Sequence, residues 1–353
     1  MTATKYTPAN ERNRARFVSV IVPTLNHARS LQTALESILV QDFPAAGYEI
    51  LVVDNGSTDD TRAVAEKAIA KNPGHSIHYI FEPIPGLLSG RHRGTKEAVG
   101  DILVFVDDDI EAAPGWLSGI ATAFKDPSVH LVGGPSRPRY EVDPPRWMTR
   151  YLNDRKGRIT CGSLSLFDIG DQTAAIDPTF VWGLNFSIRK ATLLDLKGFH
   201  PDGVPKNLLH LRGDGETGLS LKMRARRLGA LYTGTATVYH HIPKERLTVG
   251  YFERRHFAQG ISDSYTQIRK NGGVHNMQLP GQPPEGGPER GTSLYAQYAE
   301  MVHRRISGAY ADGFRFHYET VKASRQLLKW VLKADYYEYS LPDLHGLTGT
   351  SGA

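Results

Sequence analysis

The sequence predicts an α/β fold, in which a mainly parallel sheet is flanked by helices and followed by a helical C-terminal extension. Three observations lead to this prediction. Apolar runs of strand length alternate with segments of helical periodicity, a pattern typical of right-handed crossover units. Polar and acidic residues come directly after several of these runs. Beyond residue 245, apolar residues recur at helical spacing on both sides of a segment rich in Gly and Pro.

The first third of the chain supplies the core of the expected sheet. Its most apolar run, Ile102–Val106, has five consecutive apolar residues, as expected of a strand that is buried on both faces. Because ligands of such sheets bind beyond the carboxyl ends of the strands, the residues that follow each strand are candidates for a site. The predicted elements are the strand Phe17–Val22, the helix Arg29–Leu39, the strand Tyr48–Val53, the helix Thr61–Ala70, and the strands His78–Phe81 and Ile102–Val106.

The last third of the chain is predicted to be mainly helical. A strand over Gly229–His241 precedes helices at about Val249–Arg269 and Ser293–Val331. Residues 272–291 between them are too rich in Gly and Pro to form a regular element. The apolar and aromatic stripe of the last helix predicts packing on the preceding domain or a homodimer contact, with an interfacial membrane contact as a further alternative.

Three consecutive carboxylates, Asp107, Asp108 and Asp109, end the most apolar run. They repel one another unless a cation lies among them. A hard divalent ion prefers oxygen ligands and commonly carries a phosphorylated substrate, so it is the candidate that we favour. The alternative is a polar exit from the strand, with Asp109 capping a short helix. Polar clusters after the first, second and fourth strands share this sheet edge, which favours a binding site.

Four segments of the chain together carry a family resemblance, namely Val20–Asn26, Leu51–Asp59, Gly86–Gly94 and Val104–Asp109. The chain resembles the family-2 nucleotide-sugar glycosyltransferases, which have the GT-A fold, over roughly residues 17 to 242. The resemblance implies a donor-binding half at 17–130 and an acceptor and catalytic half of the same domain at 131–245. A polar tail, 1–16, precedes them, and a helical region with the loop 272–291 follows at 246–353.

The resemblance assigns the donor site to the first half. It implies that Asp54 accepts a hydrogen bond from the nucleotide base and that Arg91 and Arg93 pair with the diphosphate, as guanidinium groups do. Turn and helix-cap chemistry is the alternative for residues 55–60. Asp109 is implied as the main protein ligand of Mg²⁺ or Mn²⁺, with Asp107 and His240 as further candidates. The donor-binding candidates are Pro23, Thr24, Asn26, Asp54, Ser57, Arg91, Arg93, Asp107 and Asp108.

The same resemblance assigns the acceptor side to the second half. Trp182, Gly183 and Asn185 belong to a segment similar to the family's strand that closes the sugar pocket. Trp182 is suited to stacking on a sugar, and a core tryptophan is the alternative. Alignment of the amphipathic helix places Glu216 at the position of the catalytic base, while Asp214 is a rival. Capping of that helix is the alternative reading for both carboxylates.

The predicted function is inverting transfer of a sugar from a nucleoside-diphosphate sugar to an acceptor hydroxyl. UDP is the expected nucleotide, and GDP and dTDP stay open. The expected acceptor is a carbohydrate, lipid-linked or other hydroxyl compound in polysaccharide, glycolipid or glycoconjugate biosynthesis. A sugar-phosphate nucleotidyltransferase and a non-catalytic carbohydrate-binding scaffold are the alternatives. The first of these usually needs a glycine-rich basic loop after the first strand, and Pro23–His27 is not one.

Composition fits an enzyme of this kind. A hydrophobic content of 40% supports a real core, and the single cysteine, Cys161, excludes an intramolecular disulfide. We expect a cytoplasmic protein, because residues 1–16 are polar and no stretch reaches the roughly 18 apolar residues of a membrane span. A peripheral position at the inner face of the membrane is the alternative. The net charge of +5 is modest, and nothing predicts binding of nucleic acid.

Overall fold

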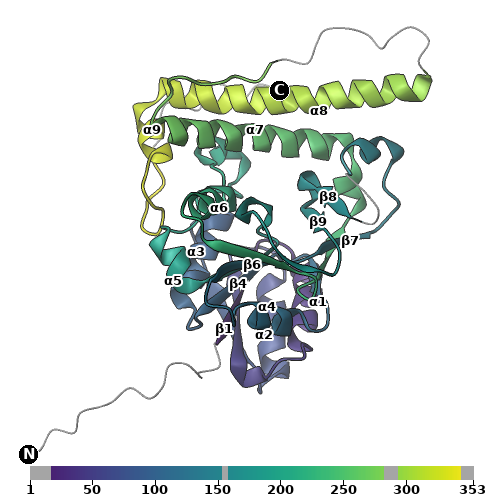
Figure 1. The fold of residues 1–353 in the computed structure, drawn as a ribbon, viewed down its shortest axis with the longest axis vertical. Helices are drawn as coiled ribbons and strands as arrows, with labels where there is room; N and C mark the ends of the chain where they lie inside the picture. The colour runs from purple at the N-terminus through teal and green to yellow at the C-terminus, as the bar shows by residue number, and fades with distance from the viewer. Residues whose placement is uncertain (1–16, 153–157, 282–292, 343–353) are drawn as a thin grey trace, which may run out of the picture.

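The computed structural model describes residues 17–152, 158–281 and 293–342. Figure 1 shows two sheets with helices on their faces in one part of the molecule. At the opposite end, the long helices α7 (Val249–Asn271) and α8 (Leu294–Ala323) lie side by side. The predicted tail, 1–16, lies outside the described residues, as does the second half of the Gly/Pro-rich loop, 282–291.

An eight-stranded sheet forms the centre of the fold. Its strands are β1 (Val18–Thr24), β2 (Tyr48–Asp54), β3 (Ser76–Phe81), β4 (Ile102–Val106), β6 (Val129–Gly133), β10 (Thr173–Ala175), β11 (Asn185–Arg189) and β12 (Gly229–Thr233). They are ordered β10-β12-β6-β11-β4-β1-β2-β3. The strands from β4 to β3 are parallel, whereas β11 runs antiparallel between β4 and β6. Strands β1, β2 and β4 are buried throughout, which explains their nearly continuous apolar sequences.

Alternating residues of the central strands face two separate cores. Val20 of β1 points to a core with α1 (Ala28–Leu39), α2 (Thr61–Lys71) and α4 (Trp116–Ala123). Its neighbour Ile21 points to the other core. That second core also takes in helices α3 (Leu87–Glu97), α5 (Lys190–Asp195) and α6 (Glu216–Ala225) and the C-terminal helices. The sheet is therefore covered on both faces, as the alternation of strands and helices predicts.

A second, five-stranded sheet begins directly after the aspartate triplet. Its strands are β5 (Ile110–Ala112), β7 (Ser136–Tyr140), β8 (Ile159–Cys161), β9 (Leu166–Asp168) and β13 (Val238–Ile242), in the order β5-β13-β7-β9-β8. In the antiparallel pair β5–β13, His240 lies opposite Ile110. The backbone N–H of His241 also donates to the carbonyl oxygen of Asp109 at 3.0 Å. This pairing brings a histidine from far along the chain beside the triplet.

Two glycines allow the helices α7 and α8 to pack backbone against backbone. A Cβ added at Gly260 would lie 2.1 Å from the carbonyl oxygen of Tyr310, and one at Gly313 would lie 2.0 Å from that of Phe257. The late helix α8 therefore packs closely on α7, which belongs to the same C-terminal region. Within the described ranges, no helix is both long enough and apolar enough to cross a membrane.

The C-terminal helices also join the second core of the eight-stranded sheet. The indole N–H of Trp330, in helix α9 (Arg325–Val331), donates to the carbonyl oxygen of Leu211 at 3.0 Å. Tyr265 of α7 is fully buried in the same core. Short 3-10 helices connect the larger elements at Ala45–Gly47 (η2), Arg146–Arg150 (η3), Gly162–Leu164 (η4), Pro178–Phe180 (η5), Lys206–Leu211 (η6) and Lys244–Leu247 (η7).

The predicted fold class is confirmed, and the strands and helices expected up to residue 106 occur within two residues of their predicted bounds. Two predictions of continuous elements are wrong. The strand expected over Gly229–His241 is two strands, because β12 and β13 join different sheets. The helix expected over Ser293–Val331 breaks at Ser324, whose hydroxyl instead caps α9 by accepting the N–H of Leu327. The boundary predicted at residue 130 falls within β6.

Candidate active site

A cavity of about 380 Å³ opens at the carboxyl ends of β1 and β4. This is the edge of the sheet where ligands bind in open α/β folds. The cavity is lined by Pro23, Thr24, Leu25, His27, Asn55, Gly86, Leu87, Gly90, Asp107, Asp108, Asp109, Gly203 and Arg246. Five predicted site residues, namely Pro23, Thr24 and the aspartate triplet, therefore share one cavity, which we call the donor cavity.

Each aspartate of the triplet faces a different cationic or titratable side chain. The oxygen-to-nitrogen pairs are Asp107 with Arg91 (3.9 Å), Asp108 with His27 (3.0 Å) and Asp109 with Arg246 (2.7 Å). The hydrogen bond to Asp108 raises the pKa of His27, even though partial burial opposes this. Side chains of the protein thus supply positive charge around the triplet, as the repulsion among three carboxylates requires.

The two outer aspartates differ in charge state. Burial, followed by the negative charge of Asp109, raises the pKa of Asp107 to about 6. Burial would raise the pKa of Asp109 as well. However, Arg246 donates to Asp109 Oδ2 at 2.7 Å and carries a positive charge, which holds that pKa well below its usual range. Asp109 is therefore the firmly ionised member of the pair at neutral pH.

Asp109 and His240 fit a divalent ion that takes few ligands from the protein. Asp109 Oδ1 is buried and has no hydrogen-bond partner in the described part of the chain. His240 Nδ1 lies 2.9 Å from the carbonyl oxygen of Leu164, so Nδ1 carries the proton and Nε2 keeps its lone pair, 3.4 Å from Asp109 Oδ2. No group of three or more His, Cys, Asp or Glu residues among those described could hold a metal. The remaining ligands of an ion here would come from substrate and water.

Arg91 joins the triplet to the second half of the chain. Its buried guanidinium donates to Glu216 Oε2 at 3.2 Å, and Glu216 Oε1 accepts the backbone N–H of Gly183 at 3.0 Å. A Cβ at Gly183 would lie 2.0 Å from Arg91 Nη2, so a glycine is needed here to leave room for the guanidinium. The predicted residues Arg91, Asp107, Gly183 and Glu216 therefore meet at one place.

The rival carboxylate Asp214 is occupied by the protein itself. Its Oδ1 lies 2.6 Å from His200 Nδ1, and its Oδ2 accepts a hydrogen bond from the hydroxyl of Thr266 at 2.7 Å. Its side chain is only 3% exposed, whereas that of Glu216 is 21% exposed. Gly215 between them has φ +56°, a turn that separates the directions of the two side chains. This geometry favours Glu216 as the carboxylate that can meet a substrate.

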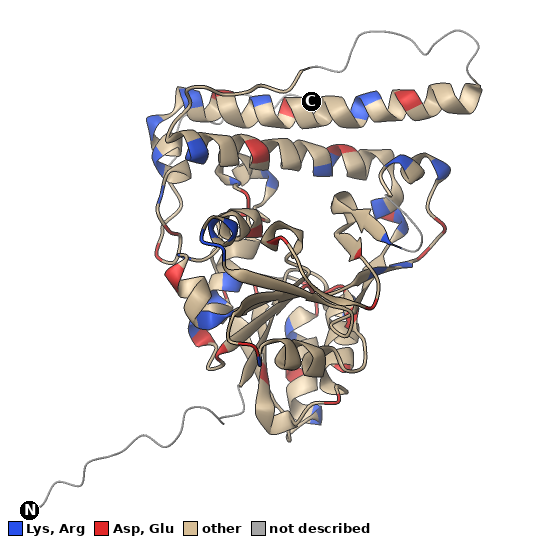
Figure 2. Cartoon of the chain, in the orientation of Figure 1, with Lys and Arg blue, Asp and Glu red and all other residues tan. Residues whose placement is uncertain are grey.

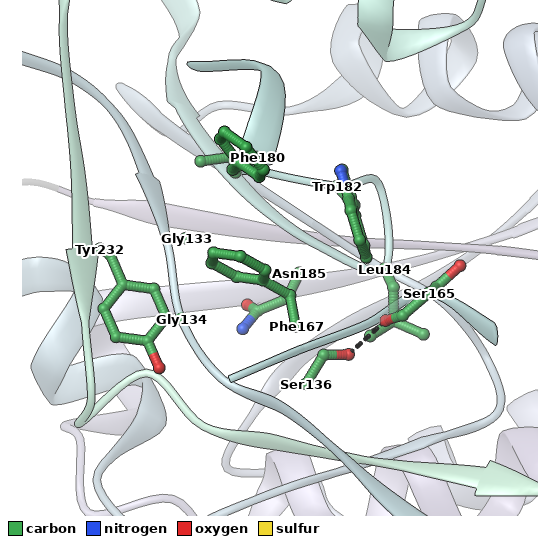
Figure 3. Close-up of a pocket in the computed structure, with 11 residues that line it drawn as sticks. Gly133, Gly134, Ser136, Ser165, Phe167, Phe180, Trp182, Leu184, Asn185 and Tyr232 are labelled. Atoms are coloured by element: carbon green, nitrogen blue, oxygen red, sulfur yellow. Dashed lines mark hydrogen bonds between the residues drawn. The ribbon is translucent and has the colours of Figure 1, made fainter. Parts of the chain in front are cut away.

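Trp182 borders a second, smaller cavity that is rich in aromatic rings (Figure 3). Its ring centroid lies 5.7 Å from that of Phe167, which lies in turn 5.6 Å from that of Phe180. The indole N–H donates to the carbonyl oxygen of Thr179 at 3.1 Å. Trp182 is half-buried, so part of its surface stays accessible to a ligand.

Asn185 lines the same small cavity but both ends of its amide are bonded within the protein (Figure 3). Its Oδ1 accepts the indole N–H of Trp116 at 3.1 Å, and its Nδ2 donates to the carbonyl oxygen of Ala236 at 2.7 Å. The residue thus links β11 to α4 and to the turn before β13. This explains its burial without any contact to a sugar.

Three predicted donor residues, Asn26, Asp54 and Ser57, do not line the donor cavity themselves. Asn26 accepts the N–H of Thr58 at 2.7 Å and donates its own N–H to Ser57 Oγ at 2.9 Å, which ties together the loops after β1 and β2. Asp54 is buried, where it accepts the N–H of Ser57 at 2.8 Å and the hydroxyl of Tyr79 at 2.7 Å. These contacts fix the loops that frame the cavity.

Arg93 lies apart from the other predicted donor residues. Its Nε is 2.9 Å from Glu97 Oε1, one helical turn further along α3. Two residues along a helix correspond to a rotation of about 200°, so Arg93 faces away from the side of Arg91. Arg93 lines a separate cavity with Tyr336 and Tyr337. This position does not suit the diphosphate contact that the sequence predicted for it.

Two titratable residues of the donor cavity, His27 and Arg246, were not predicted as site residues. His27 directly follows Asn26, and its place after the first strand was a usable signal. Arg246 belongs to a basic run that is equally typical of a solvated helix face. Only the pairing of β13 with β5 brings Arg246 to the triplet, 137 residues away in the chain.

Part of this chain is similar in sequence to several glycosyltransferases. A 118-residue segment is 36% identical to glycosyltransferase AglE of Haloferax volcanii, and covers 33% of this chain and 38% of that protein. A 154-residue segment is 33% identical to a dolichol-phosphate mannosyltransferase of Pyrococcus furiosus, and covers 44% and 42%. A 117-residue segment is 32% identical to the Campylobacter jejuni GalNAc(5)-diNAcBac-PP-undecaprenol beta-1,3-glucosyltransferase, and covers 33% and 37%. The chain thus spans about two fifths of the length of these relatives.

A solved structure is similar in fold over most of the chain. It is the mannosyltransferase PcManGT from Pyrobaculum calidifontis in complex with GDP-Man and Mn²⁺, with a TM-score of 0.54 and 18% identity. The similarity covers 91% of this chain and 79% of that one. The sequence model described as Glycosyl transferase family 2 matches residues 19–195, which is half of the chain. On the strength of this match, the chain belongs to glycosyl transferase family 2.

Proposed function

We propose that this protein is an inverting glycosyltransferase that moves a sugar from a nucleoside-diphosphate sugar to an acceptor hydroxyl. The observation that carries the proposal is the bridge formed by Arg91, which contacts Glu216 on one side and Asp107 of the donor cavity on the other. The bridge holds Glu216, the candidate catalytic base, next to Asp107, one of the carboxylates at the donor cavity. Family membership favours sugar transfer over the nucleotidyl transfer considered as an alternative.

The donor lies in the donor cavity in this proposal. Pro23 and Thr24 line the end of the cavity where the nucleotide base would lie. The buried Thr24 hydroxyl has no partner among the described residues, so it is available to a ligand. Asp107 lies towards the ribose, and Arg91 faces the diphosphate. Asp54 acts on the base either directly or by holding the loop at Ser57.

A divalent ion, Mg²⁺ or Mn²⁺, would be held by Asp109, and Asp107 and His240 are the candidates for a second protein ligand. When bound, such an ion supplies the positive charge that stabilises a departing nucleoside diphosphate. Asp109 suits this role because it is ionised and keeps one buried oxygen without a partner.

Glu216 accepts the proton of the acceptor hydroxyl in this proposal. Arg91 and the N–H of Gly183 orient its carboxylate, which stays partly exposed. The deprotonated oxygen attacks the anomeric carbon from the face opposite the diphosphate, which inverts the configuration. Trp182, half-buried beside its aromatic neighbours, offers a face for stacking on a sugar ring.

The donor and acceptor are proposed by class. UDP is the first nucleotide to test, followed by GDP, since the structural neighbour is in complex with GDP-Man. Two relatives are named for undecaprenol-linked and dolichol-phosphate chemistry, so a lipid-linked acceptor in glycolipid or glycoconjugate synthesis is the first acceptor to test. A cytoplasmic location with peripheral contact to the inner face of the membrane belongs to the same proposal, and cell fractionation tests it.

The first experiment is a thermal-shift screen of UDP, GDP and dTDP and their common sugars, with and without Mn²⁺. A ligand at 100 times its dissociation constant should add about 2.7 kcal/mol to the free energy of unfolding. We expect a metal-dependent shift with one nucleotide and release of that nucleoside diphosphate during turnover. Release of pyrophosphate instead would identify a nucleotidyltransferase. Binding of sugars without any turnover would support the non-catalytic scaffold. NMR of the anomeric proton of the product distinguishes inversion from retention.

A further inference from the structure

Arg246 occupies the position between Asp109 and His240. Its Nη2 donates to Asp109 Oδ2 at 2.7 Å, and its Nη1 lies 2.7 Å from His240 Nε2. Since His240 Nδ1 donates to the carbonyl oxygen of Leu164, Nε2 is the acceptor and Arg246 is the donor. The guanidinium of Arg246 therefore donates hydrogen bonds to both Asp109 and His240, which the proposed function assigns as ligands of a divalent ion.

Charge explains why a cation is held at this place. The ionised Asp109 is buried, and a buried carboxylate without a counter-charge is costly. Its second oxygen, Oδ1, still has no partner in the described segments. The guanidinium thus satisfies only half of the carboxylate, and an ion that reached both oxygens would satisfy it more fully.

The surroundings give the arginine room to leave. Arg246 lies in the single-turn helix η7, which follows Pro243, and its side chain is 25% exposed. It borders the donor cavity and also an adjoining cavity of about 690 Å³, and both are lined by His27 and Asp109 as well. A rotation of the side chain into either cavity would free Asp109 and His240 without moving a strand.

We propose that Arg246 is a resident counter-ion of Asp109 and His240, and that a divalent ion binds there only by displacing its guanidinium. This inference rests on the metal site of the proposed function and adds a competitor built into the chain. It makes Arg246 a residue that sets how tightly the resting protein holds the metal. Without the arginine, the metal would bind to ligands that are already free.

The test is a titration of the full chain with Mn²⁺, followed by the loss of the free-ion EPR signal, with no donor present. We expect Arg246→Ala to bind Mn²⁺ at least about tenfold more tightly than the unmodified protein, which is the worth of about one charge-assisted hydrogen bond. Arg246→Lys should fall between them, because an ammonium keeps the charge but lacks the planar fork. Thermal unfolding of each variant shows whether it is folded.

Arg139→Ala is the matched control. Arg139 lines the adjoining cavity and carries the same charge, but it pairs with Glu111 at 2.7 Å. An equal gain in Mn²⁺ affinity for Arg139→Ala and Arg246→Ala would reduce the effect to net charge and overturn the inference. So would equal or weaker binding by folded Arg246→Ala. If the unmodified protein still transfers sugar with Mn²⁺ in that case, only this inference fails. If metal changes neither binding nor transfer, the metal site of the proposed function fails with it.

Discussion

Two carboxylates in this molecule, Asp109 and Asp214, have similar burial but opposite surroundings. Asp214 lies in a network in which both oxygens have close partners from α7 and from the loop before α6. Asp109 lines two cavities, keeps one bare oxygen and is paired with an arginine that is partly exposed. The first arrangement stabilises a loop, whereas the second is one that a ligand can enter.

This difference shows that residue type and burial alone do not identify a catalytic carboxylate. Both residues follow the ends of regular elements, and both belong to acidic motifs of the sequence. Their roles separate only when each oxygen is assigned a partner. In this pair, the bare Oδ1 of Asp109 lies beside a cavity where a ligand can reach it, whereas both oxygens of Asp214 are already bonded within the fold.

The largest expected effect comes from Glu216→Gln. The amide keeps the size of the side chain but cannot accept the proton, so transfer should fall by about 10²–10⁴-fold. Binding of the donor, measured by thermal shift, should be unchanged. A normal rate of transfer in Glu216→Gln would contradict the assignment of Glu216 as the base. Loss of transfer in a folded Asp214 variant instead would identify Asp214 as the base.

Asp214→Asn should mainly affect stability. Two buried hydrogen bonds to a charged acceptor are weakened, and their loss should cost about 3 kcal/mol of the free energy of unfolding, as measured in urea. Asp195→Asn is the control, because Asp195 forms an exposed pair with Arg226 and should change stability by less than about 1 kcal/mol. Equal stability of the two variants would contradict a structural role for Asp214.

Gly183→Ala tests the bridge between the two halves of the site. The added methyl group would collide with Arg91, and the side chain would have to leave its place between Glu216 and Asp107. We expect a strain of about 1–3 kcal/mol, expressed chiefly as a fall in kcat of about tenfold. Gly162→Ala is the matched control, because a Cβ there has no atom within 4 Å. Similar kcat values for both variants would refute the bridge.

The smallest effect expected is a change in the pH dependence of stability. Burial lowers the pKa of His92 to about 3, so this residue stays neutral in the folded protein. In the unfolded chain it binds a proton below about pH 6.5, and stability is therefore lost as the pH falls from about 6.5 towards 3. At pH 5 the loss from this residue is about 2 kcal/mol.

His92→Asn should flatten that dependence. Its free energy of unfolding should fall less between pH 7 and pH 5 than that of the unmodified protein, by about 2 kcal/mol. His78→Asn, at an exposed position on β3, serves as the control. Because His92 also accepts the N–H of Phe199 and contacts the carbonyl oxygen of Tyr336, the comparison uses the slope with pH and not the absolute stability. An unchanged slope would show that His92 does not control this loss.

Much of the donor half could be predicted from the sequence because its information is local. Apolar runs and helical periodicity predicted β1 to β4 and the helices α1 and α2 to within two residues, whereas α3 was not predicted as a helix. The C-terminal part was predicted less well. Ser324 breaks a helix that periodicity alone would continue, and β12 and β13 separate because they join different sheets. Neither event has a strong local signal.

The sequence by itself determined that three carboxylates end a buried strand and that Glu216 begins a helix far along the chain. Only the tertiary structure decided which cation each carboxylate meets. Arg91 reaches Glu216 across 125 residues, and Arg246 reaches Asp109 across 137. Such pairs depend on how β11 and β13 enter the two sheets. The physical reason is that burial and charge partners are properties of the folded surroundings, and local sequence does not specify them.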